Sequence, residues 1–478
     1  MNAPRRSSFA PSLAALLAAG CAAVGPDYEP PRAEVPAAWR EPPGNGGLAA
    51  APAELAAWWT HFGDPVLDRL VERAARENLD LRTALARVRE ARALRGIAAG
   101  ERLPSVDLDA AYQRRGDSEN TPFGAFATEF DRYTISLGAA WEVDLWGRVR
   151  RADEAADADL GATIEDARDV FVLVAAETAA AYVDVRAFQR RLDVARTNVA
   201  LQEQTLALVQ ARFDAGLVRE RDVAQATTNV EATRSRVPAL EAGLRAAENR
   251  LAVLLGRSPG EMEELARTAP IPVPPARVAV GVPADLLRRR ADVRRAERVL
   301  AAETARIGVA EGDLYPRLSL LGSLGLEADH VGEVFDGDSR VFGIGPSLRW
   351  NLFDGGRLRN RVRAQDARAE QALLQWQSTV LTALEETENA MTAFVREQAR
   401  RAALLAAQTQ ARRSVELARA QYRDGLSDFQ PVLDSERTLA ELEDEVAQSE
   451  AAIANSLVRL YRALGGGWED GAGGAASS

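Results

Sequence analysis

Side chains that could carry out catalysis or bind a metal are few in this sequence. It has 478 residues but only two histidines, His61 and His330, and one cysteine, Cys21. The adjacent acids Glu385 and Glu386 could serve acid/base catalysis, but such pairs are more typical of a solvated helix face. The sequence holds no nucleophile motif, phosphate loop or metal cluster. We therefore predict a protein that is not an enzyme and needs no metal or cofactor.

The charge balance excludes a second class of proteins. Acidic residues number 70 against 59 basic ones, the net charge is −11, and every basic residue is arginine. A nucleic-acid-binding protein needs a basic face, which this composition does not supply. Alanine, arginine, glutamate and leucine dominate instead, and this favours long helices packed through small side chains.

Cys21 is best interpreted together with the residues before it. Arg5 and Arg6 form a basic start, an apolar run follows over 9–19, and small residues lead into Cys21. This is the layout of a signal peptide over 1–20, and the apolar run is too short to span a membrane. A cysteine directly after small residues is similar to a bacterial lipid-attachment site, so we predict lipidation of Cys21. The alternative is an ordinary secretion signal with an incidental cysteine.

Polar residues that follow two glycine turns form the other set of functional candidates. One turn contains Gly216 and Leu217, and the other contains Gly425 and Leu426. The candidates are Arg219, Arg221, Asp222 and Gln225 after the first turn, and Asp428, Gln430, Asp434 and Arg437 after the second. If several copies met around an axis, these side chains would form rings that select ions or hold a constriction. Asp428 would also suit an N-cap.

An internal duplication positions both turns. Trp141 and Trp350, Gly147 and Gly356, and Gly216 and Gly425 are each 209 residues apart. We expect a signal peptide over 1–20, an extended segment over 21–66, a first repeat over 67–256, a Pro-rich connection over 257–283, a second repeat over 284–465 and a flexible tail over 466–478.

The helical part of each repeat is long. Helical hairpins are predicted over 148–256 and 357–465, because proline and glycine are absent from long stretches and apolar residues recur every seven positions. The clearest heptad series is Val432, Leu439, Val446, Ile453 and Leu460. Pro238 should interrupt the second helix of the first hairpin. Gly216 and Gly425 suit left-handed helix ends, and another helix is expected over 67–100.

Strict alternation of apolar and polar residues predicts two strands over about 105–145 and two over about 317–353. Such strands fit a transmembrane β-barrel or a soluble antiparallel sheet with one buried face, and the pattern alone leaves both open. A sheet in lipid cannot leave an edge unpaired, and closed membrane barrels need at least about eight strands. If these four strands enter a membrane, several copies must share one barrel.

At this point the sequence resembles the TolC superfamily of outer-membrane channels, specifically its OprM/NodT-like lipoprotein branch. The resemblance covers nearly the whole mature chain. It rests on Gly25-Pro26-Asp27-Tyr28, Trp58-Trp59 with Phe62 and Asp64-Pro65, the two hairpin turns, the stretch Asp285–Val293, Tyr315-Pro316, and Trp350–Gly356. Ala291 stands where the family usually has proline.

The resemblance implies a membrane α+β fold. Three chains would share a twelve-stranded transmembrane β-barrel that continues into a long periplasmic α-helical barrel with an equatorial belt. It also implies a homotrimer in outer-membrane lipid, partnered by a periplasmic adaptor (membrane fusion protein) and an inner-membrane RND-type pump. The expected function is a passive exit duct for drugs or other toxic small molecules. The alternatives are an exit duct for type I protein secretion and a periplasmic coiled-coil adaptor without a pore.

The resemblance also suggests roles for the residues near the turns. Asp434 and Arg437 match the family's aperture positions, and Asp222 and Tyr422 match a pair that ties the inner hairpin to the outer one. Pro431 and Ser427 stand where the best-known branch has a second carboxylate and a locking arginine. The predicted periplasmic aperture comprises Asp434, Arg437, Asp428, Gln430, Asp222, Arg219 and Tyr422.

Overall fold

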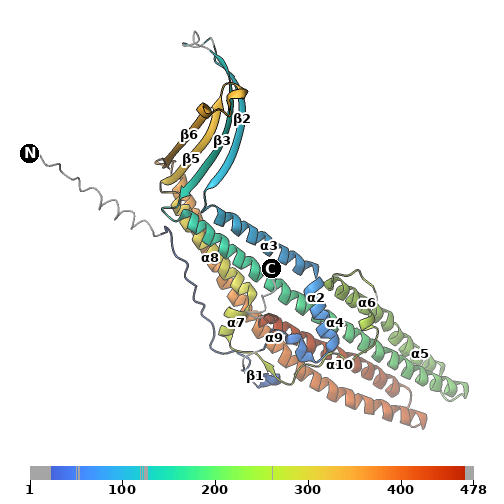
Figure 1. Ribbon diagram of the computed structural model, residues 1–478. Coiled ribbons are helices and arrows are strands. Elements are labelled where there is room, and N and C mark those ends of the chain that lie inside the picture. Colours follow the sequence, from blue (N-terminus) through green and yellow to red (C-terminus); the bar gives the residue numbers. More distant parts are fainter. Residues whose placement is uncertain are drawn as a thin grey trace, which may run out of the picture. The chain divides into compact units, whose positions relative to one another are not determined.

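The structure is a computed structural model that describes residues 23–42, 44–49, 51, 54–118, 120, 122, 128–260 and 262–468. The predicted signal peptide, Cys21 and nearly all of the predicted tail lie outside these residues. The chain forms two compact units, and both repeats contribute to each (Figure 1). Of the described residues, those within Met1–Arg32, Arg87–Thr163 and Arg295–Trp376 form unit 1, and those within Ala33–Ala86, Ile164–Arg294 and Gln377–Ser478 form unit 2.

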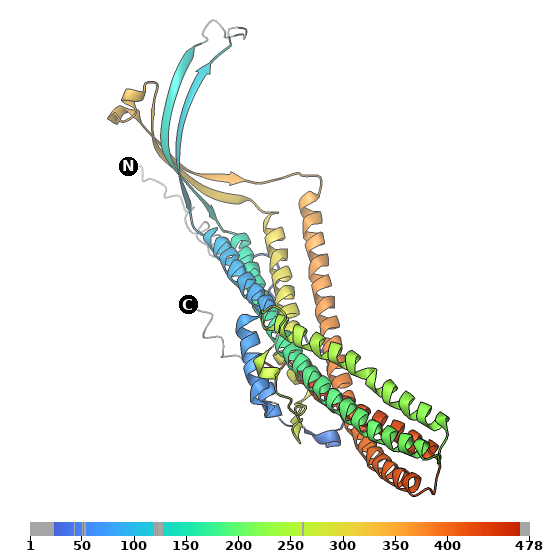
Figure 2. The same ribbon diagram turned by 90° about the vertical axis from the view of Figure 1, so that its right-hand side faces the viewer.

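Unit 1 is built around one antiparallel sheet of four strands, shown in Figure 2. The order across the sheet is β2-β3-β5-β6. The strands are β2 (Ser105–Gly116), β3 (Glu129–Val143), β5 (Arg317–Ala328) and β6 (Arg340–Arg349). The two predicted hairpins are therefore confirmed, although β6 ends at Arg349, before the predicted end near 353.

The register gathers most of the apolar residues of the four strands on one face. Leu108 lies opposite Leu137, which lies opposite Leu324, which in turn lies opposite Phe342. Serine, glycine and charged residues occupy most of the other face, which also carries Leu321 of β5 and Val341 of β6. Phe342 is 78% exposed and Ile344 is 90% exposed. In a single chain the apolar face is uncovered, and within the described residues β2 and β6 each have one unpaired edge.

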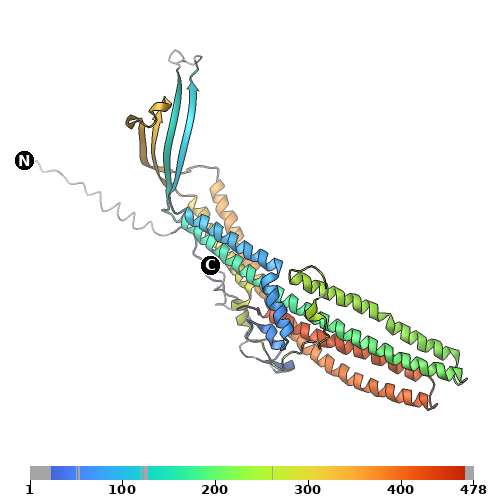
Figure 3. The same ribbon diagram turned by 45° about the vertical axis from the view of Figure 1, so that its right-hand side comes forward.

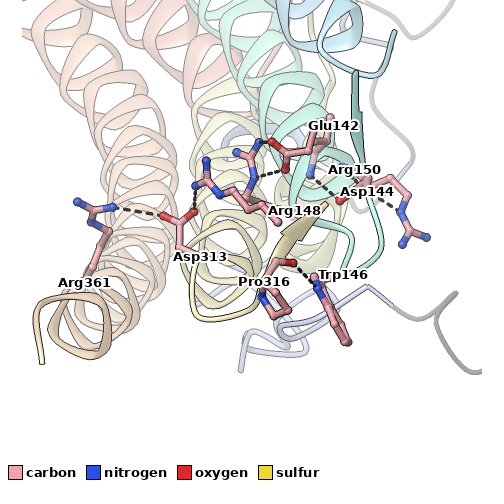
Figure 4. Close-up of polar contacts among 10 residues, drawn as sticks. Glu142, Asp144, Trp146, Arg148, Arg150, Asp313, Pro316 and Arg361 are labelled. Carbon is pink, nitrogen blue, oxygen red and sulfur yellow. Dashed lines mark hydrogen bonds and ion pairs between the residues drawn. The ribbon is translucent and has the colours of Figure 1, made fainter. Parts of the chain in front are cut away.

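A capped junction turns β3 into the long helix α4 (Arg148–Asp214). The Asp144 carboxylate accepts hydrogen bonds from the backbone N–H groups of Val149 at 3.2 Å and Arg150 at 3.0 Å, which satisfies free donors of the first turn. The Arg148 guanidinium makes two 3.0 Å hydrogen bonds to Glu142 (Figure 4). The end of the strand and the start of the helix are thereby held together.

The junction that leads into β5 is tied to the first one. The indole N–H of Trp146 donates to the carbonyl of Pro316 at 2.9 Å, as Figure 4 shows, and its ring stacks on Tyr315. The Asp313 carboxylate pairs with Arg361 of α9 (Arg357–Arg423) at 3.3 Å and with Arg317 of β5. These contacts fix how the two repeats meet at the base of the sheet.

The predicted helix over 67–100 is wrong as one continuous helix. The structure has α2 (Pro65–Glu77) and α3 (Leu79–Gly100), separated by Asn78 in an extended conformation. The buried Asn78 amide accepts a hydrogen bond from the N–H of Leu81 at 3.0 Å and donates to the carbonyl of Leu254 at 2.9 Å. Asparagine forms such local caps readily, and this interrupts the helix.

Long helices form most of the chain outside the sheet, and most of them lie in unit 2. The helices after α4 are α5 (Glu220–Arg234), α6 (Arg236–Leu254), α7 (Pro283–Arg289), α8 (Ala291–Gly312), α9 and α10 (Gln430–Ala463). All five residues of the predicted heptad series in α10 are buried. As predicted, Pro238 interrupts its helix: it has no N–H to donate to the carbonyl of Arg234, where α5 ends.

Short elements complete unit 2. Strands β1 (Leu48–Ala49) and β4 (Val278–Ala279) form a small parallel pair, and Trp58 stacks on Tyr461 of α10 at 5.3 Å. None of the helices in the described part of the chain is long and apolar enough to cross a membrane.

Candidate functional site at the helical hairpin ends

The first hairpin turn has the conformation that its glycine predicts. Helix α4 ends at Asp214 and α5 begins at Glu220. Gly216 has a φ of +73°, its N–H donates to the carbonyl of Phe213 at 2.8 Å, and the N–H of Leu217 donates to that of Arg212 at 2.9 Å. These bonds satisfy carbonyls that the end of the helix leaves free.

The second turn repeats this geometry. Gly425 has a φ of +75°, its N–H donates to the carbonyl of Tyr422 at 3.1 Å, and the N–H of Leu426 donates to that of Gln421 at 2.8 Å. Both predicted left-handed helix ends are confirmed. Leu217 and Leu426 are exposed at the tips of their turns.

The two hairpins pack together through one apolar cluster next to the turns. Figure 3 shows α4, α5, α9 and α10 running alongside one another in this part of unit 2. The tip cluster consists of Val209, Ala226, Ala418, Tyr422, Phe429, Val432 and Leu433. Because all four helices contribute, movement of one hairpin against the other must open this cluster.

A buried carboxylate lies one turn beyond the tip cluster. Glu436 of α10 is 4% exposed. It accepts hydrogen bonds from the Thr205 hydroxyl at 2.6 Å, from the Asn229 amide at 3.3 Å, and from Arg419 Nε and Nη2 at 3.0 and 2.9 Å. Its partners come from α4, α5 and α9, so one side chain links all four helices. Buried charges persist when they are paired and hydrogen-bonded in this way.

The candidate residues on α10 lie on the exposed side of this network. Arg437 Nε donates to Asn229 Oδ1 at 3.2 Å, so Asn229 joins Arg437 to Glu436. The Gln430 amide donates to the Asp434 carboxylate at 2.9 Å, one turn further along. The structure thus brings Gln430, Asp434 and Arg437 to one helix start, where all three are exposed.

Asp428 is exposed, but the expectation that it caps α10 is wrong. The N-cap position is Phe429, which has no side-chain acceptor, and α10 begins at Gln430 followed by Pro431. Proline suits the first turn because it has no N–H to satisfy. The buried Phe429 side chain belongs to the tip cluster, so apolar packing sets the start of this helix.

The candidates on the first hairpin lie at the start of α5. Arg219 occupies the N-cap position without a side-chain hydrogen bond, and its carbonyl accepts from the N–H of Asp222 at 2.9 Å. The Asp222 carboxylate pairs with Arg221 at 3.4 Å. An acidic side chain in the first turn also interacts favourably with the helix dipole.

Tyr422 is linked to the first hairpin through Arg212. The Arg212 guanidinium lies 4.7 Å from the centre of the Tyr422 ring and donates to the Tyr422 carbonyl. Among the described residues, the Tyr422 hydroxyl has no hydrogen-bond partner, so the expected pairing with Asp222 is not a hydrogen bond here. Burial raises the pKa of Tyr422, the charge of Asp222 raises it further, and Arg212 opposes the shift.

Known proteins place the chain in a family. A family model described as "Outer membrane efflux protein" matches residues 70–257 and 282–466. The chain belongs to the outer membrane efflux protein family. It is 34% identical to nodulation protein T of Rhizobium leguminosarum bv. trifolii, over 95% of this chain and 96% of that protein. It is 31% identical to outer membrane protein OprJ of Pseudomonas aeruginosa, over 98% of each chain.

The chain is also similar to a solved structure of the outer-membrane channel OprN. The TM-score is 0.88 with 38% sequence identity, over 93% of this chain and 99% of that one. The predicted membership of the TolC superfamily is confirmed. This outer membrane efflux protein is a channel component that extends from the outer membrane into the periplasm, and the interpretation as an adaptor without a pore is wrong.

Sequence reasoning missed the buried network of this efflux protein. Glu436 and Arg419 were not among the candidates, although a signal existed. Glu436 is four residues after Val432 and three before Leu439, so it lies on the apolar face of its helix. Arg419 stands in the same relation to the buried Val415 and Tyr422. A charged residue on an apolar stripe indicates a buried partner.

Proposed function

We propose that three copies of this chain assemble into one exit duct. Each copy would contribute four strands to a twelve-stranded barrel in outer-membrane lipid and two hairpins to a periplasmic α-helical barrel. The supporting observation is the sheet, which in one chain has a continuous exposed apolar face and two unpaired edges. Lipid cannot satisfy free backbone groups, so such edges need neighbours from other copies.

The hairpin ends would form the periplasmic aperture of this duct. Three-fold symmetry would bring three copies each of Asp434, Arg437, Asp428, Gln430, Asp222, Arg219 and Tyr422 around one axis. The exposed residues would set the constriction, because rings of charge near an axis attract or exclude ions. The tip cluster and Glu436 would hold the two hairpins of each chain together when the aperture is closed.

The remaining roles follow from this assembly. A periplasmic adaptor and an inner-membrane RND-type pump would open the aperture, and drugs or other toxic small molecules would pass through without a binding pocket in the duct. Residues 1–20 would be removed as a signal peptide and Cys21 would be lipidated. The two efflux repeats would extend over 67–256 and 284–465, joined by the segment 257–283, with a flexible tail over 466–478.

Assembly is tested first by measuring the mass of the detergent-purified protein with light scattering. We expect three copies, and a band in unheated SDS gels that shifts on boiling. A single copy would overturn the duct.

The aperture is tested in planar lipid bilayers. Asp434→Ala combined with Asp222→Ala should raise ion conductance, because two carboxylates near the proposed constriction are removed. Glu441→Ala removes an exposed carboxylate further along α10 and serves as the matched control. Equal conductance in the double variant and the parent would remove these residues from the aperture but leave the assembly intact.

A further inference from the structure

Opposite charges stand on the two free edges of the sheet. Asp107 and Asp109 are exposed on edge strand β2, and Arg349 is exposed at the end of edge strand β6. Their register places all three on the polar face of the sheet. Within the described residues, none of the three has an ion-pair partner. Charges on free edges also discourage aggregation, and this is the rival explanation.

The internal duplication extends to the register of the two strand hairpins. Ser105 of β2 lies opposite Ala140 of β3, and Arg317 of β5 lies opposite Arg349 of β6. Adding 212 to the number of Ser105 gives Arg317, and adding 209 to that of Ala140 gives Arg349. Strands β2 and β5 are therefore equivalent, and so are β3 and β6.

One junction within the chain then supplies the geometry of the junction between chains. Strand β3 pairs with β5, so the equivalent pairing joins β6 with β2 of a second copy. Within the chain, Ala140 lies opposite Leu321 and Trp141 lies opposite Leu320. Adding 209 converts Ala140 of β3 to its equivalent in β6, Arg349. Subtracting 212 converts Leu321 and Leu320 of β5 to their equivalents in β2, Asp109 and Leu108.

We propose that β6 of one copy pairs antiparallel with β2 of the next, with Arg349 directly opposite Asp109 of the partner subunit. This inference rests on the proposed shared barrel and adds its strand register. Residues directly opposite in antiparallel strands have Cβ atoms about 4.5–5.5 Å apart, within reach of an ion pair. The guanidinium and carboxylate would face the water-filled side of the sheet.

The apolar face agrees with the same register. Trp350 would lie opposite Leu108 of the partner subunit, which repeats the pairing of Trp141 with Leu320 inside the chain. Trp350 and Leu108 are 54% and 69% exposed in the single chain. A slip by one residue would turn every apolar side chain of one strand to the polar face. A slip by two would place Arg349 opposite Asp107 or Ala111, so the register needs a direct test.

Cysteine cross-linking measures the register. Full-length chains would carry Arg349→Cys together with Asp109→Cys, Asp107→Cys or Ala111→Cys, and outer-membrane fractions would be oxidised and run on non-reducing gels. The parent, which retains Cys21, controls for background. We expect covalently linked trimers to form most completely with Asp109→Cys. Preferential linkage to Asp107→Cys or Ala111→Cys, or an intact trimer that none of the three pairs links, would overturn the register. A protein that is a single copy by mass would overturn the proposed function itself.

Charge reversal separates an ion pair from edges that are charged only to prevent aggregation. Arg349→Glu should lower the temperature at which the trimer dissociates in SDS, because two acids would then face each other. Adding Asp109→Arg should restore that temperature, and adding Asp107→Arg should restore it less. An unchanged temperature for Arg349→Glu, or no restoration by Asp109→Arg, would overturn the pairing.

Discussion

Replacing Glu436 by glutamine tests how the two hairpins of one chain are held together. Glutamine has nearly the shape of glutamate but no charge. The wild-type carboxylate accepts hydrogen bonds from Thr205, Asn229 and Arg419, so it joins both hairpins. In the variant, the Arg419 guanidinium would lose its ionic partner, and one of the remaining donors would face an amide N–H group.

The size of the effect follows from burial. Breaking a fully buried ion pair costs about 3–5 kcal/mol. Glu436 is buried, but the Arg419 side chain is 30% exposed and can regain water. We therefore expect a loss of about 2–3 kcal/mol per chain, near the range of charge-assisted hydrogen bonds. If that free energy stabilises only the closed arrangement, the ratio of closed to open states falls roughly 30- to 150-fold.

Two measurements are needed. A residue that only packs the helices affects stability alone, whereas a residue that also holds the aperture closed affects channel opening as well. Thermal unfolding of the purified protein, followed by circular dichroism, measures stability. Planar-bilayer recordings measure how often the channel opens and its conductance. Glu441→Gln is the matched control, because it removes the same charge from an exposed position on the same helix. We expect Glu436→Gln to lower stability and to increase opening, and Glu441→Gln to do neither.

Two results would refute this reasoning. If Glu436→Gln unfolds at the parent's temperature, the buried ion pair contributes no net stability. If the variant is less stable but opens no more often than the parent, Glu436 packs the helices without controlling the aperture.

Three further predictions concern the fold. Gly425→Ala should lower the free energy of unfolding by about 1–2 kcal/mol because φ is +75°, whereas Gly96→Ala, in an uncrowded stretch of helix, should raise it by up to about 1 kcal/mol. Trp146→Phe should cost about 1 kcal/mol by leaving the Pro316 carbonyl without its donor. Burial raises the pKa of Tyr461 from 10.0 to about 12. The folded state therefore holds the Tyr461 proton more tightly than the unfolded state does. The stabilisation from this proton is complete below pH 10, and between pH 10 and 12 the free energy of unfolding should fall by up to about 1.4 kcal/mol per pH unit. Tyr461→Phe should remove that part of the pH dependence. Urea titrations in detergent measure all three.

The helices and strands could be predicted because their signals are local. Alternation places Leu108 and Tyr112 on one face whatever else the chain does, and the heptads of α10 predict its buried stripe from Val432 to Leu460. The left-handed ends at Gly216 and Gly425 were predictable for the same reason, since only local backbone geometry requires glycine there.

Contacts between distant segments could not be predicted in this way. Asn78 caps α3 locally, but its amide also donates to the carbonyl of Leu254, which is far away in the sequence. Glu436 can be recognised as a charge on an apolar stripe, but the choice of Arg419 as its partner depends on which helices meet. Periodicity identifies the buried face of a helix without identifying what covers it.

The two repeats have diverged unevenly, and the pattern agrees with the proposed duct. At the sheet, the pairing of Ser105 with Ala140 recurs as that of Arg317 with Arg349. At the hairpin ends the equivalents differ: Tyr422 is 2% exposed, whereas Phe213, its counterpart in the first repeat, is 37% exposed.

The buried carboxylate shows the same divergence. Thr227 stands 209 residues before Glu436, and its hydroxyl donates to the carbonyl of Val223 within its own helix. The second hairpin therefore supplies the buried charge and the first supplies neutral partners, Thr205 and Asn229. A shared barrel must close with one register at every junction, so its strands tolerate little divergence. An aperture has no such closure requirement, so the ends of its two hairpins can diverge.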